Sequence, residues 1–196
     1  MLKKMNLPNK LTLLRIVMVP FIVAVMLIEF PLHYLIAGVL FGLASLTDML
    51  DGRIARRDNL VTDFGRFADP LADKILVISM MICFVSSGWI GPIPVIIVLF
   101  REFAITSLRL VAASKGTVIA ANKWGKLKTV LQIDALVILF IFLSILGVME
   151  LSHSDTAALT RVFHLITDGM MWIVAAVTIV SGVIYVRDNR SVIADM

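Results

Sequence analysis

The feature that most constrains this chain is a series of six apolar stretches, each about as long as a membrane-crossing helix. Such a helix needs about 20 apolar residues to span the hydrocarbon core of a bilayer. Short polar segments, some of them containing Gly or Pro, separate the stretches. The stretches are residues 12–29, 33–56, 70–88, 92–113, 127–148 and 165–186. They predict an all-α integral membrane protein with six transmembrane helices in a single domain, residues 1–196.

The composition excludes a protein that folds in water. Of the 196 residues, 60% are hydrophobic and 16% are charged, and the mean hydropathy is +0.98. A soluble domain averages roughly 45–50% apolar and about 25% charged residues. A chain of this length cannot bury so many apolar side chains in one aqueous core, which excludes a soluble enzyme and a disordered regulator. The single cysteine, Cys83, permits no internal disulfide.

Lysines and arginines gather on alternate connections between the stretches. Of the 18, 16 lie in residues 1–15, around the second and fourth connections, or in the C-terminal tail. Cytoplasmic loops of membrane proteins carry an excess of these residues, so both termini and the two basic connections are predicted to face the cytoplasm. The net charge of +4 therefore reports topology, and no nucleic-acid partner is expected. Residues 2–7 favour a short interfacial helix before Pro8, with a flexible basic tail as the alternative.

Four acidic residues lie close to the second connection, at depths where charge is costly and usually functional. They are Asp48, Asp51, Asp69 and Asp73. The spacings i, i+3 and i, i+4 place each pair on one helix face. Turn-forming residues between 57 and 65 predict a helical hairpin. Asp48 and Asp73 then lie roughly 12 Å on either side of the turn, so the two pairs face each other below the cytoplasmic surface.

Four carboxylates packed together cannot all stay ionised without cations. Hard oxygen ligands suit Mg²⁺ or Mn²⁺, and Ca²⁺ is an alternative. Two divalent ions would balance the four charges, and such two-metal sites stabilise phosphoryl displacement. The alternative is an interfacial network in which the aspartates pair with nearby cations. Those cations are Arg53, Arg56, Arg66 and Lys74.

Small residues accompany the first aspartate pair. Gly52 and Ala55 follow Asp48 at i+4 and i+7, on the same helix face, where a ligand or another helix could approach closely. Arg56 could contact a diphosphate, because a guanidinium matches phosphate geometry. Gly38 and Gly42 form a Gly-x-x-x-Gly pair, for which helix packing is the preferred interpretation.

These residues form a pattern: Asp48-x-x-Asp51-Gly52-x-x-Ala55-Arg56, eight residues, then Gly65-x-x-x-Asp69-x-x-x-Asp73. The pattern resembles the signature of the CDP-alcohol phosphotransferase family, with every fixed position filled. Residues 6–15, 69–74, 101–109 and 125–129 also resemble the bacterial phosphatidylglycerophosphate synthases of that family. The resemblance implies a six-helix enzyme of the bacterial inner membrane, often a homodimer, with its active site facing the cytoplasm.

The resemblance also implies a reaction. The phosphatidyl group of CDP-diacylglycerol is transferred to sn-glycerol 3-phosphate, with CMP leaving, when the acceptor hydroxyl attacks the β-phosphorus. By motif position, the four aspartates hold two divalent ions, and Asp73 is also the general base. Gly52, Ala55 and Arg56 line the CDP pocket, with Asn9 and Thr12 as weaker candidates. An alternative acceptor within the family is inositol phosphate.

The acceptor carries a phosphate dianion and needs its own cations. Arg109 and Lys126 are the first candidates, and Arg101 and Lys128 are the next. The alternative is that these cations only report topology. Glu102 lies about 100° round the helix from Arg101, so it is not an expected partner. Asp134 is a candidate for that place.

Two other classes of protein use intramembrane aspartates. A cation transporter would spread acidic groups through the depth of the membrane. A membrane prenyltransferase would carry Asp-rich motifs on two separate pairs of helices. The aspartates here are confined to one hairpin, beside a separate basic region, which favours the phosphatidyltransferase.

Overall fold

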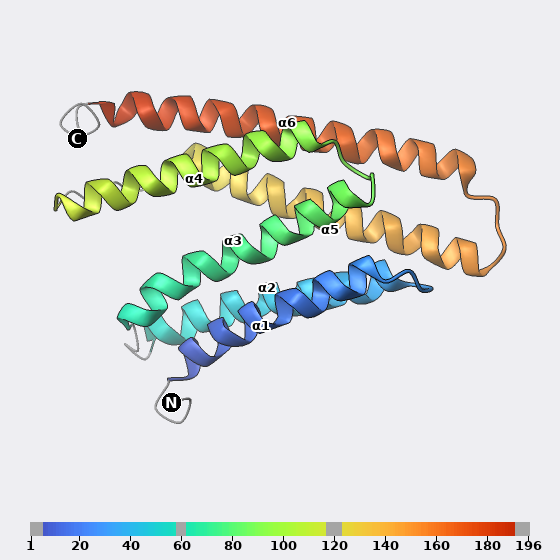
Figure 1. Ribbon diagram of the computed structural model, residues 1–196, viewed down its shortest axis with the longest axis horizontal. Helices are drawn as coiled ribbons and strands as arrows, with labels where there is room; N and C mark the ends of the chain where they lie inside the picture. The colour runs from blue at the N-terminus through green and yellow to red at the C-terminus, as the bar shows by residue number, and fades with distance from the viewer. Residues whose placement is uncertain (1–5, 58–61, 117–122, 191–196) are drawn as a thin grey trace. The chain divides into compact units, whose positions relative to one another are not determined.

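The computed structural model describes residues 6–57, 62–116 and 123–190, except for eight side chains within helices. Those positions are Met49, Gly52, Arg53, Ala55, Arg56, Arg57, Asp63 and Arg66. The described chain is all-helical, with six helices and no strand (Figure 1). They are α1 (Leu7–Leu27), α2 (His33–Arg57), α3 (Asp63–Ser86), α4 (Pro92–Ser114), α5 (Lys123–Leu151) and α6 (Ala157–Asp188).

Each helix overlaps most of one of the six predicted stretches, so the all-α prediction is confirmed. Most helices extend beyond the apolar run at one or both ends, because polar residues continue the helical backbone, whereas α1 and α3 end two residues before their predicted stretches do. Among the described residues, three helices, α1, α5 and α6, are long and apolar enough to cross a membrane. In α2 the apolar part is the shorter segment His33–Asp48. That all six helices cross the membrane stays a prediction.

Helix α1 begins where its sequence provides a cap. The side chain of Asn6 accepts a hydrogen bond from the backbone N–H of Asn9 at 3.1 Å, and Pro8 lies in the first turn. Asn and Pro are favoured at these positions because the first N–H groups of a helix have no partner within it. Leu7 and Pro8 thus belong to α1. The predicted interfacial helix falls mainly on residues 1–5, outside the described part of the chain.

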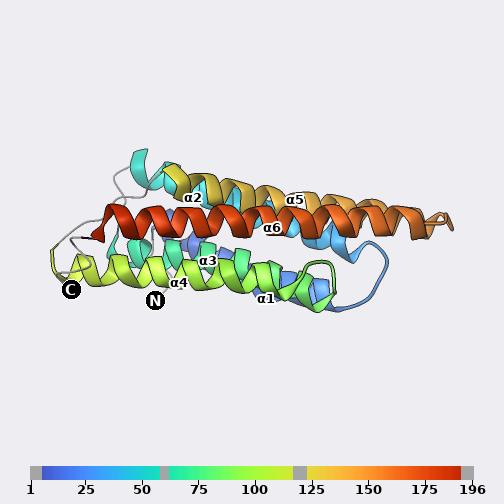
Figure 2. The same cartoon turned by 90° about the horizontal axis from the view of Figure 1, so that it is seen from above.

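The chain divides into two compact units. Unit 1 is Met1–Phe84 with Leu139–Thr160, and unit 2 is Val85–Ile138 with Arg161–Met196. In unit 1, α1 and α2 lie side by side and antiparallel (Figures 1 and 2). Its core includes buried side chains from α1, α2, α3 and the second half of α5.

An aromatic cluster links three helices within unit 1. The ring of Phe140 on α5 lies 5.4 Å from that of Phe41 on α2 and 4.9 Å from that of Phe84 on α3. Gly38 makes room for this cluster, because a Cβ added there would lie 3.1 Å from Phe140 Cβ. The packing role expected of Gly38 is therefore confirmed. At Gly42 an added Cβ would meet no described atom within 4 Å, so the same role is not seen there.

In unit 2, the α3–α4 connection is bonded to the first half of α6. The backbone N–H of Gly91 donates to Asp168 Oδ1 at 2.9 Å, and a ring nitrogen of His164 bonds with the carbonyl oxygen of Gly88 at 2.9 Å. Gly88 has φ of +77°, a conformation that favours glycine. These bonds set where α4 starts relative to α6, within the unit that carries most of the basic candidates.

We predict that Gly38→Leu destabilises the protein and that Gly42→Leu does not. The new side chain at position 38 would displace Phe140, and overpacking of this kind costs typically about 1–3 kcal/mol. At position 42 the space is open, so the change is expected to stay within about 0.5 kcal/mol. Thermal unfolding of both variants in detergent checks this. Equal melting temperatures for the two variants would contradict the packing of Gly38 on Phe140.

Candidate active site

The two aspartate pairs meet, as the predicted hairpin requires. Asp48 and Asp51 lie on α2, which ends at Arg57, and Asp69 and Asp73 lie on α3, which begins at Asp63. Side chains of α1 contact both pairs. The chain reversal between α2 and α3 is therefore confirmed, although residues 58–61, with Asp58 and Asn59 of the predicted turn, lie outside the described part.

Arg15 on α1 lies at the centre of this cluster. Its Nη1 donates to Asp48 Oδ1 at 2.9 Å and also to Asp73 Oδ1. Its Nη2 donates to Asp51 Oδ2 at 2.6 Å. The Arg15 side chain is 0% exposed, whereas those of Asp48 and Asp73 are 47% and 49% exposed. The cluster is therefore buried around Arg15 and accessible to solvent at Asp48 and Asp73.

Thr12 is the second side chain of α1 in the buried part of the cluster. Its hydroxyl lies 2.7 Å from Asp69 Oδ1 and 3.4 Å from Asp51 Oδ2, and 3.1 Å from the carbonyl oxygen of Pro8. A hydroxyl has one proton to donate, and the shortest of these contacts is to Asp69. Thr12 and Arg15 together thus contact all four carboxylates from one helix.

Asn9 holds the start of α3. Its Oδ1 accepts a hydrogen bond from Thr62 Oγ1 at 3.0 Å, and Thr62 Oγ1 accepts one from the N–H of Gly65 at 3.0 Å. A Cβ added at Gly65 would lie 3.1 Å from Asn9 Oδ1, which is tighter than ordinary contact. The glycine of the motif therefore lets α1 and α3 approach closely, next to Asp69.

The basic candidates lie in unit 2 and form a network of their own. Arg101 Nη1 and Lys128 Nζ both bond with Glu102 Oε1, at 3.0 and 2.8 Å, and Arg101 Nη2 donates to Ser181 Oγ at 2.8 Å. The expectation that Glu102 would not pair with Arg101 is wrong. A long, flexible arginine side chain can turn back towards its neighbour, which a helical-wheel angle does not take into account. The Lys128 side chain is only 2% exposed.

Arg109 lies against a tyrosine. Its Nε donates to Tyr185 Oη at 3.1 Å, and its guanidinium carbon lies 5.2 Å from the centre of that ring. Both contacts leave the positive charge of Arg109 in place, because the partner is neutral. Lys126 is exposed near the start of α5.

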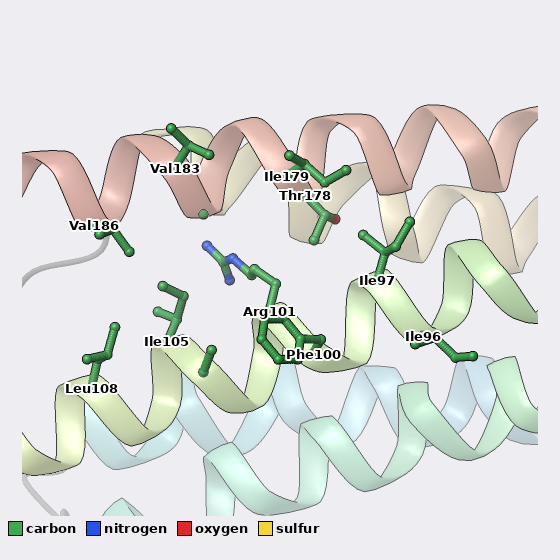
Figure 3. Close-up of a pocket in the computed structure, with 12 residues that line it drawn as sticks. Ile96, Ile97, Phe100, Arg101, Ile105, Leu108, Thr178, Ile179, Val183 and Val186 are labelled. Atoms are coloured by element: carbon green, nitrogen blue, oxygen red, sulfur yellow. The ribbon is translucent and has the colours of Figure 1, made fainter.

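Arg101 also lines a cavity of about 640 Å³ between α4 and α6 (Figure 3). The other lining residues are almost all apolar, among them Phe100, Ile105 and Val183. Within the described residues, the buried Nε of Arg101 and Oγ1 of Thr178 have no hydrogen-bond partner. Arg101 is thus a cation in an apolar setting, with its charge directed to Glu102.

A comparison with family models matches residues 5–180 to the CDP-alcohol phosphatidyltransferases. The chain belongs to the CDP-alcohol phosphatidyltransferase family. Its relatives include proteins named CDP-diacylglycerol–glycerol-3-phosphate 3-phosphatidyltransferase. The Bacillus subtilis protein is 41% identical over 84% of this chain and 91% of its own length. The Rickettsia bellii protein is 38% identical over 93% of this chain and 94% of its own length.

For a phosphatidyltransferase of this family, the resemblance implies divalent metal ions, and the donor set fits them in the chemistry of its ligands. Carboxylate oxygens are hard ligands, and Asp48 and Asp73 are each about half exposed. One guanidinium carries a single positive charge against four carboxylates. In the described part of the chain, however, no group of three or more Asp, Glu, His or Cys side chains is arranged to hold an ion. The Arg15 guanidinium lies among the carboxylates instead.

The donor-binding candidates are described only in part. Asn9 and Thr12 are buried beside the aspartates. Gly52, Ala55 and Arg56 continue α2, and their surroundings lie outside what the structure describes. The same holds for Arg53 and Arg66, two of the cations in the alternative pairing network.

Sequence reasoning missed Arg15 as a site residue. The charge pattern places Arg15 among the cations of residues 1–15 that indicate topology, and the resemblance over residues 6–15 assigns it no role in the site. A signal was available, because Asn9, Thr12 and Arg15 recur at three-residue steps along one side of an apolar helix. A buried guanidinium at this position needs acidic partners. The four aspartates are the acidic residues predicted to lie at a similar depth in the membrane.

We predict that Glu102→Gln destabilises the protein by about 3 kcal/mol, because breaking a buried ion pair leaves an uncompensated charge. The double variant with Lys128→Gln should cost less than the sum of the two single changes. Unfolding in detergent measures all three. Glu150→Gln, the same change at an exposed position of α5, serves as the control. Strictly additive effects of Glu102 and Lys128 would contradict the shared network.

Proposed function

We propose that this phosphatidyltransferase moves the phosphatidyl group of CDP-diacylglycerol to sn-glycerol 3-phosphate, giving phosphatidylglycerol phosphate and CMP. The observation that carries the proposal is the meeting of both aspartate pairs of the family motif around α1. The choice of acceptor follows the names of relatives that are 41% and 38% identical over most of the chain.

The reaction requires an activated hydroxyl and a stabilised leaving group. Asp73, half exposed, would accept the proton of the acceptor hydroxyl as general base. The hydroxyl oxygen forms a bond to the β-phosphorus, next to the lipid, as the bond from that phosphorus to the CMP oxygen breaks. Asp48, Asp51, Asp69 and Asp73 would hold two divalent ions, Mg²⁺ or Mn²⁺, which when bound supply positive charge to the diphosphate and the leaving group.

The remaining residues of the motif position the donor. Gly52 and Ala55 would let the CDP group approach α2, and Arg56 would contact its diphosphate. Thr12 holds Asp69 by a hydrogen bond of 2.7 Å, and Asn9 holds the start of α3 through Thr62. Fixed carboxylates matter because most of the rate enhancement in phosphoryl transfer comes from positioning and electrostatics.

The acceptor phosphate would be bound by the basic candidates on α4 and α5. Arg109 and Lys126 are the primary ligands in this proposal. The charge of Arg109 is supported by the neutral ring of Tyr185, so it remains available to an anion. Arg101 and Lys128 share the carboxylate of Glu102, which makes them secondary ligands.

We also propose the membrane arrangement that the charge pattern favours. All six helices cross the bacterial inner membrane as one domain, residues 1–196, with both termini and the active site on the cytoplasmic side. The protein is expected to form a homodimer. Labelling of single cysteines introduced into the connections, with a reagent that does not cross membranes, tests the orientation.

The experiment that tests the function is CMP release by the purified protein in detergent with CDP-diacylglycerol as donor. We expect release with sn-glycerol 3-phosphate and Mg²⁺ or Mn²⁺, and much less with inositol phosphate. Asp73→Asn should fold and lose at least about 100-fold in turnover, since a general base contributes typically 10²–10⁴-fold. Release with inositol phosphate alone would change the acceptor. No release with either, together with cation flux in vesicles, would favour a transporter.

We predict that Arg109→Ala raises the KM for glycerol 3-phosphate about 10- to 100-fold, because hydrogen bonds to charged groups contribute about 1.5–3 kcal/mol. The KM for CDP-diacylglycerol should change little. Tyr185→Phe, which removes only the hydroxyl that accepts from Arg109, should act in the same direction but more weakly. Steady-state kinetics with each substrate varied in turn measures this.

The control for this prediction is Lys123→Ala, an exposed cation at the start of α5. It should leave both KM values unchanged. Equal increases in the two KM values for Arg109→Ala would argue against a separate acceptor pocket.

A further inference from the structure

Arg15 is a cation inside the cluster that, by the proposed function, binds divalent cations. We propose that Arg15 is a built-in counter-ion: it holds the aspartates together in the metal-free protein and competes with divalent ions for them. The inference rests on the proposed function, in that these aspartates are taken to be the metal ligands.

Each nitrogen of the Arg15 guanidinium has a hydrogen-bond acceptor. Nη1 bonds with Asp48 and Asp73, Nη2 bonds with Asp51, and Nε lies 3.4 Å from Thr47 Oγ1. All three nitrogens therefore point to acceptors on α2 and α3. The side chain has no exposed surface. This is a dedicated binding place for a guanidinium, built from the carboxylates of the motif.

The charge of Arg15 is permanent. Arginine does not lose its proton in proteins, and a buried guanidinium without anionic partners is unfavourable. Without metal, Arg15 and the aspartates therefore satisfy each other. Removing the guanidinium would leave like charges facing each other across α2 and α3, and the metal-free protein would be less stable.

The same charge opposes metal binding. A divalent ion bound by these carboxylates would lie close to a fixed positive charge, and the two like charges repel each other at such short range even beside the solvent-exposed side of the cluster. Arg15 also occupies one oxygen of each of three carboxylates, Asp48, Asp51 and Asp73. An incoming ion must compete for these oxygens or use the remaining ones. The site therefore binds metal more weakly than the same four carboxylates would without Arg15.

This arrangement has a consequence for the enzyme. The hairpin and α1 can assemble around Arg15 before any metal is present, so the site does not depend on metal to fold. The weakened affinity also lets metal be exchanged. A purely structural role for Arg15, by contrast, predicts that its loss disorders the ligands and weakens metal binding.

The test is Mn²⁺ binding by the purified full chain, followed by the electron paramagnetic resonance signal of free Mn²⁺. Arg15→Gln should bind Mn²⁺ at least about tenfold more tightly than the wild type, which corresponds to about 1.4 kcal/mol. Its melting temperature in EDTA should fall, and saturating Mn²⁺ should raise it more than in the wild type. Arg15→Lys keeps the charge and should bind Mn²⁺ close to the wild-type value.

Lys10→Gln is the matched control, because it removes one positive charge from an exposed position on the same helix. It should change neither Mn²⁺ affinity nor stability. If Arg15→Gln precipitates in EDTA, its affinity is measured by chelator competition starting from the Mn²⁺-loaded protein. Equal or weaker Mn²⁺ binding by folded Arg15→Gln would overturn the inference.

A further variant separates this inference from the proposed function. Asp69 bonds with Thr12 rather than with Arg15, so Asp69→Asn should weaken Mn²⁺ binding without removing the counter-ion. If Asp69→Asn binds Mn²⁺ like the wild type, the proposed metal site is wrong. If Asp69→Asn weakens binding but Arg15→Gln does not strengthen it, only the role of Arg15 is wrong.

Discussion

The contact between the buried guanidinium of Arg15 and the carboxylates of α2 and α3 is the interaction on which the site depends. A charge with no exposed surface must be met by opposite charge at hydrogen-bond distance. Arg15 meets this condition with three aspartates from two helices. The contact therefore requires α2 and α3 to form a hairpin and requires α1 to lie against it. Thr12 and Asn9, on the same side of α1, extend this contact to Asp69 and to the start of α3.

Pairing of buried charges is also found in unit 2, with the signs reversed. Here one carboxylate, Glu102, bonds with the two cations Arg101 and Lys128. Arg109 differs, because its partner is the neutral Tyr185. Unit 1 thus carries a set of acidic side chains and unit 2 a set of basic ones, and buried charge pairing holds each set in place within a largely apolar chain.

Much of the candidate site could be predicted from the sequence. The spacing of Asp48 with Asp51, and of Asp69 with Asp73, follows helical geometry, so each pair could be assigned to one face. The turn residues between 57 and 65 indicated the reversal that brings the pairs together. Two features could not be predicted. The charge pattern explained Arg15 as a cation that indicates topology, and the helical angle placed Glu102 away from Arg101. Which partner each side chain reaches depends on its torsion angles, which a sequence pattern does not contain.

By itself, the sequence determined the class of this protein, its six helices and its family motif. These depend on local properties: apolar runs long enough for a bilayer, helical periodicity, and residue types at set spacings. Only the tertiary structure decided which charges meet, with Arg15 among the aspartates and Glu102 between Arg101 and Lys128. The physical reason is that a buried charge pairs with whichever opposite charge lies within a few ångströms. Residues distant in sequence come within that range only when the helices pack.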